Sequence, residues 1–129
     1  MPSYRTDLGR ARGLGSAKHG VGGFMVERVT AIALIPLVLW AVYSALVLSL
    51  ATYQGAVIWL RSPVNAVLLG LLLVVGFWHM HVGLRVVVED YIHKPLGKSL
   101  CLLANLFVCV GGCALALFCV LKVAFGGAF

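Results

Sequence analysis

Three long stretches of almost unbroken apolar residues dominate this chain, and polar residues gather before, between and after them. The stretches cover residues 29–53, 64–88 and 100–125. Each is long enough for about 20 helical residues, the length that crosses a bilayer. The pattern therefore predicts an all-α membrane protein with three transmembrane helices in one membrane domain, residues 24–129. Residues 1–23 form a basic, glycine-rich N-terminal tail. We expect it to be irregular up to Lys18, and the helical pattern of the first span to start near Gly22 or Phe24.

Prolines and a serine mark the expected helix ends. Ser62 and Pro63 have the residue types of an N-cap and a first helical position, so the second helix should begin there. Pro95 should end that helix soon after Tyr91. Pro36 lies inside the first stretch and predicts either a kink or a compensating contact with a neighbouring helix.

The composition excludes a soluble globular domain. Hydrophobic residues make up 62% of the chain and charged residues only 11%, which is typical of an integral membrane protein. Too little chain lies outside the three stretches for a soluble catalytic domain. The formal net charge of +6 indicates membrane topology rather than nucleic-acid binding, because no aromatic-interleaved basic domain accompanies it.

Basic residues also predict how the chain crosses the membrane. Those before the main part of the first stretch are Arg5, Arg10, Arg12, Lys18 and Arg28. Positive charges stay on the cytoplasmic side, so we expect the N-terminus there. The loop with Arg61 then lies outside, and the loop with His93, Lys94 and Lys98 lies inside. Membrane lipid and a soluble partner are both candidates to meet the basic tail.

The third stretch holds all the cysteines of the chain, but little chemistry. They are Cys101, Cys109, Cys113 and Cys119. Free cysteine usually packs as a small buried hydrophobe. No histidine, aspartate or further cysteine nearby in sequence completes a metal set, so neither a zinc motif nor a disulfide framework is indicated. Gly111 and Gly112 offer a surface for close helix packing, and Asn105 is expected to bond to a neighbouring helix.

The second stretch carries ionisable groups inside an apolar helix and at its end. His79 and Asp90 are eleven residues apart. At about 100° per residue they share one helix face, roughly 16 Å apart along the axis. Tyr91 follows at the edge of the membrane. One face thus carries an imidazole within the membrane and a carboxylate beside a phenol at its edge, which suits a redox site better than a passive anchor.

The two histidines of this helix cannot bind one iron atom together. His81 lies about 200° around the helix from His79. It shares its own face with Arg85, which can pair with Glu89 at i+4. No other apolar stretch contains a histidine, so a haem with two histidine ligands would need another subunit. Gly83, one turn after His79, leaves room for a flat macrocycle near the backbone.

Spacing alone leaves plainer interpretations open. His79 and His81 are also compatible with hydrogen bonds to neighbouring helices or with the lining of a polar seam. Asp90 and Tyr91 are also compatible with a solvated helix end, because charged and aromatic residues favour membrane interfaces.

The same residues resemble a known family. The motif His-x-His-x-Gly-Leu over residues 79–84, followed by Val-Val-x-Asp-Tyr over residues 87–91, is similar to the second helix of the small hydrophobic membrane anchor of succinate dehydrogenase (complex II) in its two-histidine form. Residues 16–21, Phe24 and residues 28–32 resemble that family's entry into its first helix. The length, the three spans and the basic tail match over the whole chain.

The resemblance implies a role for each residue of this face. His79 corresponds to an axial ligand of the haem b iron, and a histidine of the companion anchor subunit supplies the other ligand. Asp90 and Tyr91 correspond to the pair at the ubiquinone site. Tyr91 would donate a hydrogen bond to a quinone carbonyl oxygen, and Asp90 would orient the surrounding network or relay protons.

The resemblance also implies contacts with the haem propionates. Arg28 corresponds to an arginine that reaches toward a propionate, as a guanidinium suits a carboxylate. Some members carry a histidine six residues earlier, where this chain has Gly22, and His19 is the candidate to replace it. His81 matches the second histidine of the motif and is expected to support the site rather than to bind the iron.

The function implied is that of a three-span anchor in a heteromeric helical bundle of the bacterial inner membrane. It would share haem b with the companion cytochrome b anchor subunit and help form a cytoplasmic-side ubiquinone site. Electrons would arrive from succinate through a flavoprotein and an iron–sulfur subunit, which links the tricarboxylic acid cycle to the respiratory chain. This chain lacks a flavin fold and a cysteine set for clusters, so we expect a non-dehydrogenating subunit of succinate:ubiquinone oxidoreductase.

Two alternatives remain open from the sequence. A self-contained transmembrane cytochrome b would need facing histidines on two of its own spans, whereas this chain has them on one. A haem-free structural anchor or assembly protein of a respiratory complex would use the histidines only for packing.

Overall fold

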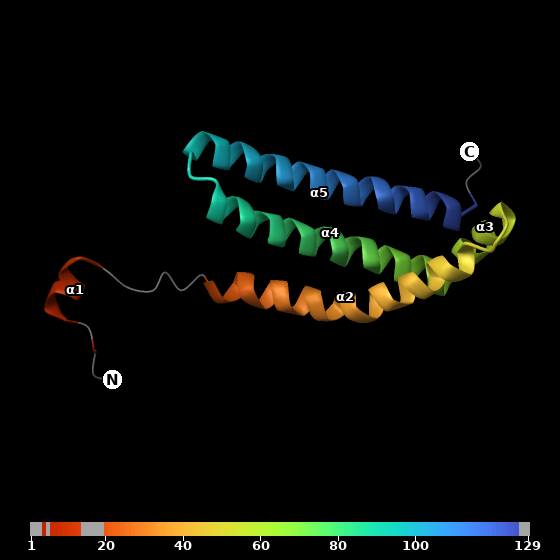
Figure 1. Cartoon of the computed structure of the whole chain (residues 1–129), viewed down its shortest axis with the longest axis horizontal. Coiled ribbons are helices and arrows are strands. Elements are labelled where there is room, and N and C mark those ends of the chain that lie inside the picture. Colours follow the sequence, from red (N-terminus) through yellow and green to blue (C-terminus); the bar gives the residue numbers. More distant parts are fainter. Residues whose placement is uncertain (1–3, 5, 14–19, 127–129) are drawn as a thin grey trace.

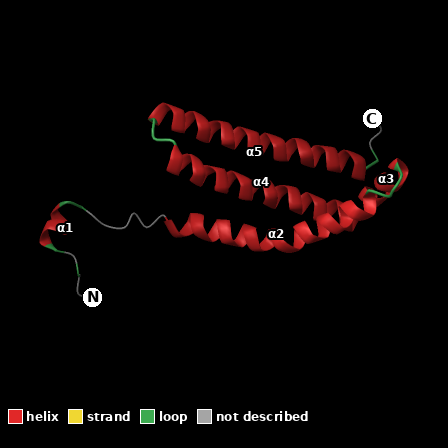
Figure 2. Ribbon diagram, viewed as in Figure 1, coloured by secondary structure: helices red, strands yellow, loops and turns green. Residues whose placement is uncertain are grey.

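The computed structural model describes residues 4, 6–13 and 20–126 of the 129-residue chain. Within these residues every regular element is a helix (Figure 2), which confirms the predicted all-α class. The helices are α1 (Asp7–Ala11), α2 (Gly20–Leu48), α3 (Tyr53–Arg61), α4 (Pro63–Tyr91) and α5 (Pro95–Ala124).

The long helices α2, α4 and α5 lie side by side, and each runs antiparallel to the one before it (Figure 1). Helix α4 is central, because it packs against both α2 and α5. The three helices have 29, 29 and 30 residues, and each is long and apolar enough to cross a membrane. The start of α2 and the connection from α4 to α5 lie at the same end of the bundle (Figure 1).

Most apolar side chains of the bundle face outward. Among the described residues, the buried side chains are Ser44, Asn105, Cys109 and Val120. Large apolar residues are exposed along all three long helices, for example Leu39 and Phe107, each 68% exposed. Such a surface is suited to lipid or to other membrane helices rather than to water.

The predicted helix ends are partly correct. Helix α4 begins at Pro63 with Ser62 at the N-cap position, as predicted, although the Ser62 side chain makes no capping hydrogen bond. The helix also ends at Tyr91, ahead of Pro95. Helix α5 begins at Pro95, ahead of the apolar stretch that starts at residue 100, because Pro95 can occupy the first helical position without losing an intrahelical hydrogen bond.

The predicted end of the first span, at residue 53, is wrong. Helix α2 ends at Leu48, and a separate short helix, α3, follows. Thr52 has an extended backbone, and its hydroxyl accepts a hydrogen bond from the Gly55 amide at 3.3 Å, so it starts a new helix rather than continuing the old one. Helix α3 folds back on the bundle, where the rings of Trp59 and Trp40 of α2 stack with centroids 5.7 Å apart.

The expected irregular tail is also wrong in part. Helix α1 forms within it, because Thr6 caps the Gly9 amide at 3.1 Å and Asp7 lies in the first turn, where a negative charge favours a helix. Helix α2 already begins at Gly20. Pro36 lies inside α2 without ending it, and the helix is bowed along its length (Figure 1).

One glycine of α5 lies closely against a side chain of α4. A Cβ atom added at Gly112 would lie 2.9 Å from Cε1 and 3.2 Å from Cζ of Phe77 on α4. The same atom added at Gly111 would meet nothing within 4 Å. Of the two glycines predicted to form a packing surface, Gly112 therefore lies against a neighbouring helix within this chain and Gly111 does not.

We expect Gly112→Ala to lower the free energy of unfolding by about 1–3 kcal/mol, because the ring of Phe77 must move to admit the methyl group. Gly111→Ala is the matched control, since it makes the same change in helix propensity on the same helix without a clash. Thermal unfolding of the purified complex in detergent measures both. Equal melting temperatures for the two variants would show that the Phe77 contact does not limit packing.

Candidate functional site

Helix α4 places His79 against α2 in the apolar part of the bundle. Its Nδ1 lies 2.9 Å from the hydroxyl oxygen of Thr30 on α2. The same oxygen lies 2.8 Å from the carbonyl oxygen of Val26 and 3.1 Å from that of Glu27. Thr30 is ten residues beyond Gly20 at the start of α2, which corresponds to about 15 Å along the helix. The imidazole is therefore well inside the hydrophobic span.

An apolar groove borders the His79 ring. It has a volume of about 420 Å³ and is lined by Ala31, Leu34, Ile35, Val38, Leu39 and His79. Along α4, Gly76 and Gly83 flank His79, and a Cβ atom added at either glycine would meet nothing within 4 Å. The chain's own atoms thus leave open space beside the imidazole and along the neighbouring backbone of α4.

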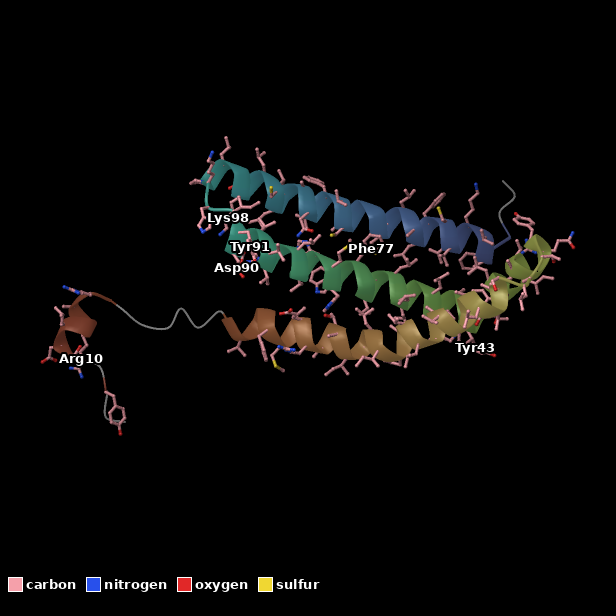
Figure 3. All side chains as sticks on the ribbon, in the orientation of Figure 1. Arg10, Tyr43, Phe77, Asp90, Tyr91 and Lys98 are labelled. Carbon is pink, nitrogen blue, oxygen red and sulfur yellow. The ribbon has the colours of Figure 1, made fainter. Side chains whose placement is uncertain are left out.

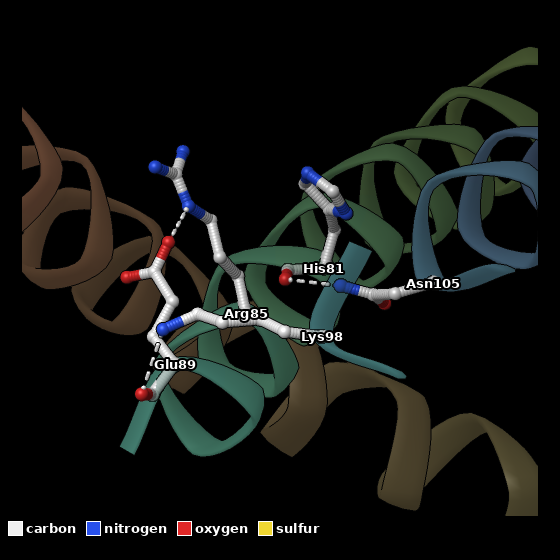
Figure 4. Close-up of polar contacts among 5 residues, drawn as sticks. All are labelled: His81, Arg85, Glu89, Lys98 and Asn105. Atoms are coloured by element: carbon white, nitrogen blue, oxygen red, sulfur yellow. Dashed lines mark hydrogen bonds and ion pairs between the residues drawn. The ribbon is translucent and has the colours of Figure 1, made fainter. Parts of the chain in front are cut away.

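His81 lies on a different face of α4 from His79, as the 200° separation predicts, and this face meets α5. Its backbone carbonyl accepts a hydrogen bond from Asn105 Nδ2 at 3.0 Å (Figure 4). Asn105 Oδ1 in turn accepts a hydrogen bond from the Cys109 thiol at 3.2 Å. The predicted bond from Asn105 to a neighbouring helix is confirmed. The His81 ring is tilted against Trp78, with centroids 5.9 Å apart. Its buried Nδ1 has no hydrogen-bond partner among the described residues.

Asp90 and Tyr91 lie on the last turn of α4, at the end where α4 passes into α5 (Figure 3). Both are exposed, and 79% of Tyr91 is accessible. Within the described residues neither side chain makes a hydrogen bond or ion pair, so both remain available to molecules outside this chain.

Polar contacts secure the backbone of this last turn. Lys98 on α5 donates from Nζ to the carbonyl oxygen of Glu89 at 3.0 Å (Figure 4). The Glu89 carboxylate pairs with Arg85 Nε at 2.8 Å, which confirms the predicted i, i+4 pair. This ion pair is largely exposed and contributes only a few tenths of a kcal/mol, about 0.3–0.5. The Lys98 bond joins two helices and satisfies a carbonyl at a helix end.

Arg28 lies near the start of α2 and is exposed. Its guanidinium carbon is 5.0 Å from the centre of the Phe24 ring, within range of a cation–π contact. No described contact joins it to His79 or to Asp90. His19, the other candidate for the propionates, lies outside the described residues. The structure therefore places the predicted site residues in one half of the bundle without bringing them into mutual contact.

Sequence reasoning missed Thr30 as a site residue. It stands within the run that resembles the family's first helix, but nothing in the sequence pairs it with a histidine 49 positions later. A polar side chain inside a long apolar helix was the available signal.

Comparison with known proteins shows the family of this chain. The family described as succinate dehydrogenase/fumarate reductase transmembrane subunit matches residues 2–113. The chain belongs to this family. The succinate dehydrogenase hydrophobic membrane anchor subunit of Rickettsia conorii is 33% identical over 109 residues, which is 83% of this chain and 86% of the relative. That of Rickettsia bellii is 32% identical over 106 residues, 81% of this chain and 84% of the relative. No solved structure matches.

Family membership confirms the resemblance noted from the motifs. The chain is a membrane-anchor subunit of succinate dehydrogenase, an oxidoreductase complex, and its three long apolar helices are consistent with a multi-pass membrane protein. Within this anchor, the end where α4 passes into α5 carries the exposed Asp90 and Tyr91.

We expect Lys98→Met to speed amide hydrogen exchange in the last turn of this anchor's α4 by about 5-fold, because a hydrogen bond worth about 1 kcal/mol is lost. Exchange measured by mass spectrometry on peptides from residues 86–94 tests this. Lys94→Met is the matched control, since it removes a nearby exposed cation whose side chain makes no hydrogen bond within the described residues. Equal exchange in both variants would mean that the lysine bond does not hold the turn.

Proposed function

We propose that this anchor binds haem b through His79, jointly with a companion anchor subunit, and contributes Asp90 and Tyr91 to a ubiquinone-reduction site. The observation that carries the proposal is the environment of His79. Its Nδ1 is engaged by Thr30, so Nε2 is the nitrogen left to bind a metal ion, and the ring borders an open apolar groove. Histidine ligands usually hold their second nitrogen in a hydrogen bond in this way.

The residues around His79 suit a large apolar cofactor. When bound, haem b supplies a carrier of single electrons within the membrane. The aliphatic side chains of α2 give the groove an apolar wall, and the glycines on either side of His79 leave the backbone of α4 accessible. Arg28 is exposed nearer the membrane edge, where its guanidinium can reach a propionate.

Asp90 and Tyr91 suit a quinone head group at the membrane edge. Ubiquinone accepts protons as well as electrons when it is reduced. Tyr91 would donate its hydroxyl hydrogen to a quinone carbonyl oxygen and stabilise the negative charge that develops there. Asp90 would orient that network or pass protons from the aqueous side. Because both side chains are exposed in this chain, partner subunits would supply the remaining walls of the pocket.

The proposed orientation puts this end of the bundle in the cytoplasm of a bacterial cell. Arg28, Lys94 and Lys98 lie at this end, and Arg61 and Lys122 lie toward the other. Basic residues are retained on the cytoplasmic side of the inner membrane. An iron–sulfur subunit and a flavoprotein subunit would then dock at the α4–α5 end and deliver electrons from succinate close to Tyr91.

We expect His79→Ala to abolish or strongly disturb the haem b band in reduced-minus-oxidised spectra of the complex with its companion anchor. His81→Ala is the matched control, because it removes an imidazole two residues away that faces α5, and it should leave the band in place. A band unchanged in the His79 variant would refute ligation by His79. If neither histidine mattered and no haem band were present at all, a haem-free structural anchor would be the better assignment.

We expect Tyr91→Phe to slow succinate-dependent ubiquinone reduction by about 100-fold, the usual cost of losing one donor to a developing oxyanion. The haem band should persist, because Tyr91 is about three turns from His79. Tyr43→Phe serves as the control, since Tyr43 is also exposed but lies toward the opposite end of the bundle (Figure 3). Equal rates for the two variants would remove Tyr91 from the quinone site.

A further inference from the structure

We infer that Thr30 is a positioning residue for His79, whose hydroxyl oxygen accepts the Nδ1 proton and so presents Nε2 of the imidazole to the haem iron. The inference rests on the proposed ligation by His79 and adds a residue from a different helix to it. Through Thr30, α2 would help to set the orientation and the basicity of the His79 imidazole.

The neighbours of the Thr30 hydroxyl favour one direction for its hydrogen bond with His79. A threonine hydroxyl has one hydrogen and two lone pairs. The carbonyl oxygens of Val26 and Glu27, 2.8 Å and 3.1 Å away, can only accept. The hydroxyl therefore donates to its own helix backbone, and its oxygen faces His79 Nδ1 at 2.9 Å as an acceptor. In this arrangement the proton between them belongs to Nδ1, which leaves the lone pair on Nε2.

The hydroxyl oxygen of Thr30 is held in place by α2 itself. Both of its carbonyl partners belong to the preceding turn of the same helix, an arrangement that threonine adopts readily in helices. Thr30 and His79 are also both half-buried, within the hydrophobic spans of α2 and α4. The position of the imidazole is therefore coupled to the packing of α2 on α4.

His81 shows what a histidine of the same helix looks like without such a partner. Its Nδ1 is buried and unpaired among the described residues, and only its backbone carbonyl is hydrogen-bonded to a side chain. Of the two histidines on α4, the one whose Nδ1 contacts a hydroxyl is thus His79, which borders the groove on α2.

The bond has an electronic consequence. An imidazole that donates from Nδ1 to an acceptor becomes a more basic ligand at Nε2. A more basic axial ligand favours ferric over ferrous haem and lowers the reduction potential. Removal of the acceptor should therefore shift the potential of the haem b to more positive values while His79 stays in place.

The experiment compares Thr30→Val with Thr30→Ser in the complete complex. Valine has nearly the shape of threonine but no acceptor, and serine keeps the oxygen. The readout is the midpoint potential of the haem b band in a redox titration. We expect a positive shift, or loss of the band, for valine and a value close to that of the unmodified complex for serine. Ser44→Ala, which removes another buried hydroxyl from α2, should leave the potential unchanged.

The potentials of the variants test whether the Thr30 oxygen positions His79. Valine and serine variants with the same potential, or with the same loss of the band, would overturn the role of the Thr30 oxygen. A shift in the Ser44 variant as large as in the valine variant would also overturn it, because any lost hydroxyl would then act alike. The His79→Ala spectrum separates this failure from failure of the proposed function, since a retained band there refutes the ligation itself.

Discussion

Each described hydrogen bond between side chains or backbone of different long helices has α4 as one partner. Thr30 on α2 meets His79, and Asn105 and Lys98 on α5 reach the backbone of α4 at residues 81 and 89. In a bilayer, apolar side chains gain little from leaving lipid for another helix, so close packing and polar contacts decide how helices assemble. The central position of α4 therefore fixes both the fold and the site.

The sequence was sufficient for features that depend on composition or on short spacing. Hydropathy predicted the three spans, the pair Ser62 and Pro63 predicted the start of α4, and the i, i+4 spacing predicted the bond between Arg85 and Glu89. Hydropathy did not predict the end of α2, because the residues between Leu48 and Thr52 are too few and too apolar to interrupt the pattern. A single cap at Thr52 decides that boundary, and caps are weak signals in sequence.

The site was predictable residue by residue, but not as an arrangement. Periodicity placed His79 and His81 on different faces of one helix, as the structure shows, yet it could not say which helix each face would meet. That choice depends on tertiary packing, for example on Gly112 accepting the Phe77 ring from α4 while Gly111 faces away. The bond from Thr30 joins positions 49 residues apart, and no local pattern encodes such a distance.

The separation of His79 from Asp90 along α4 has a further consequence under the proposed assignment. Eleven residues keep them about 16 Å apart, with one in an apolar groove and the other at an exposed helix end. Electrons tunnel across such distances through protein, whereas protons need a chain of water or titratable groups. One rigid helix would thus let electrons move inside the membrane while protons stay at its aqueous boundary.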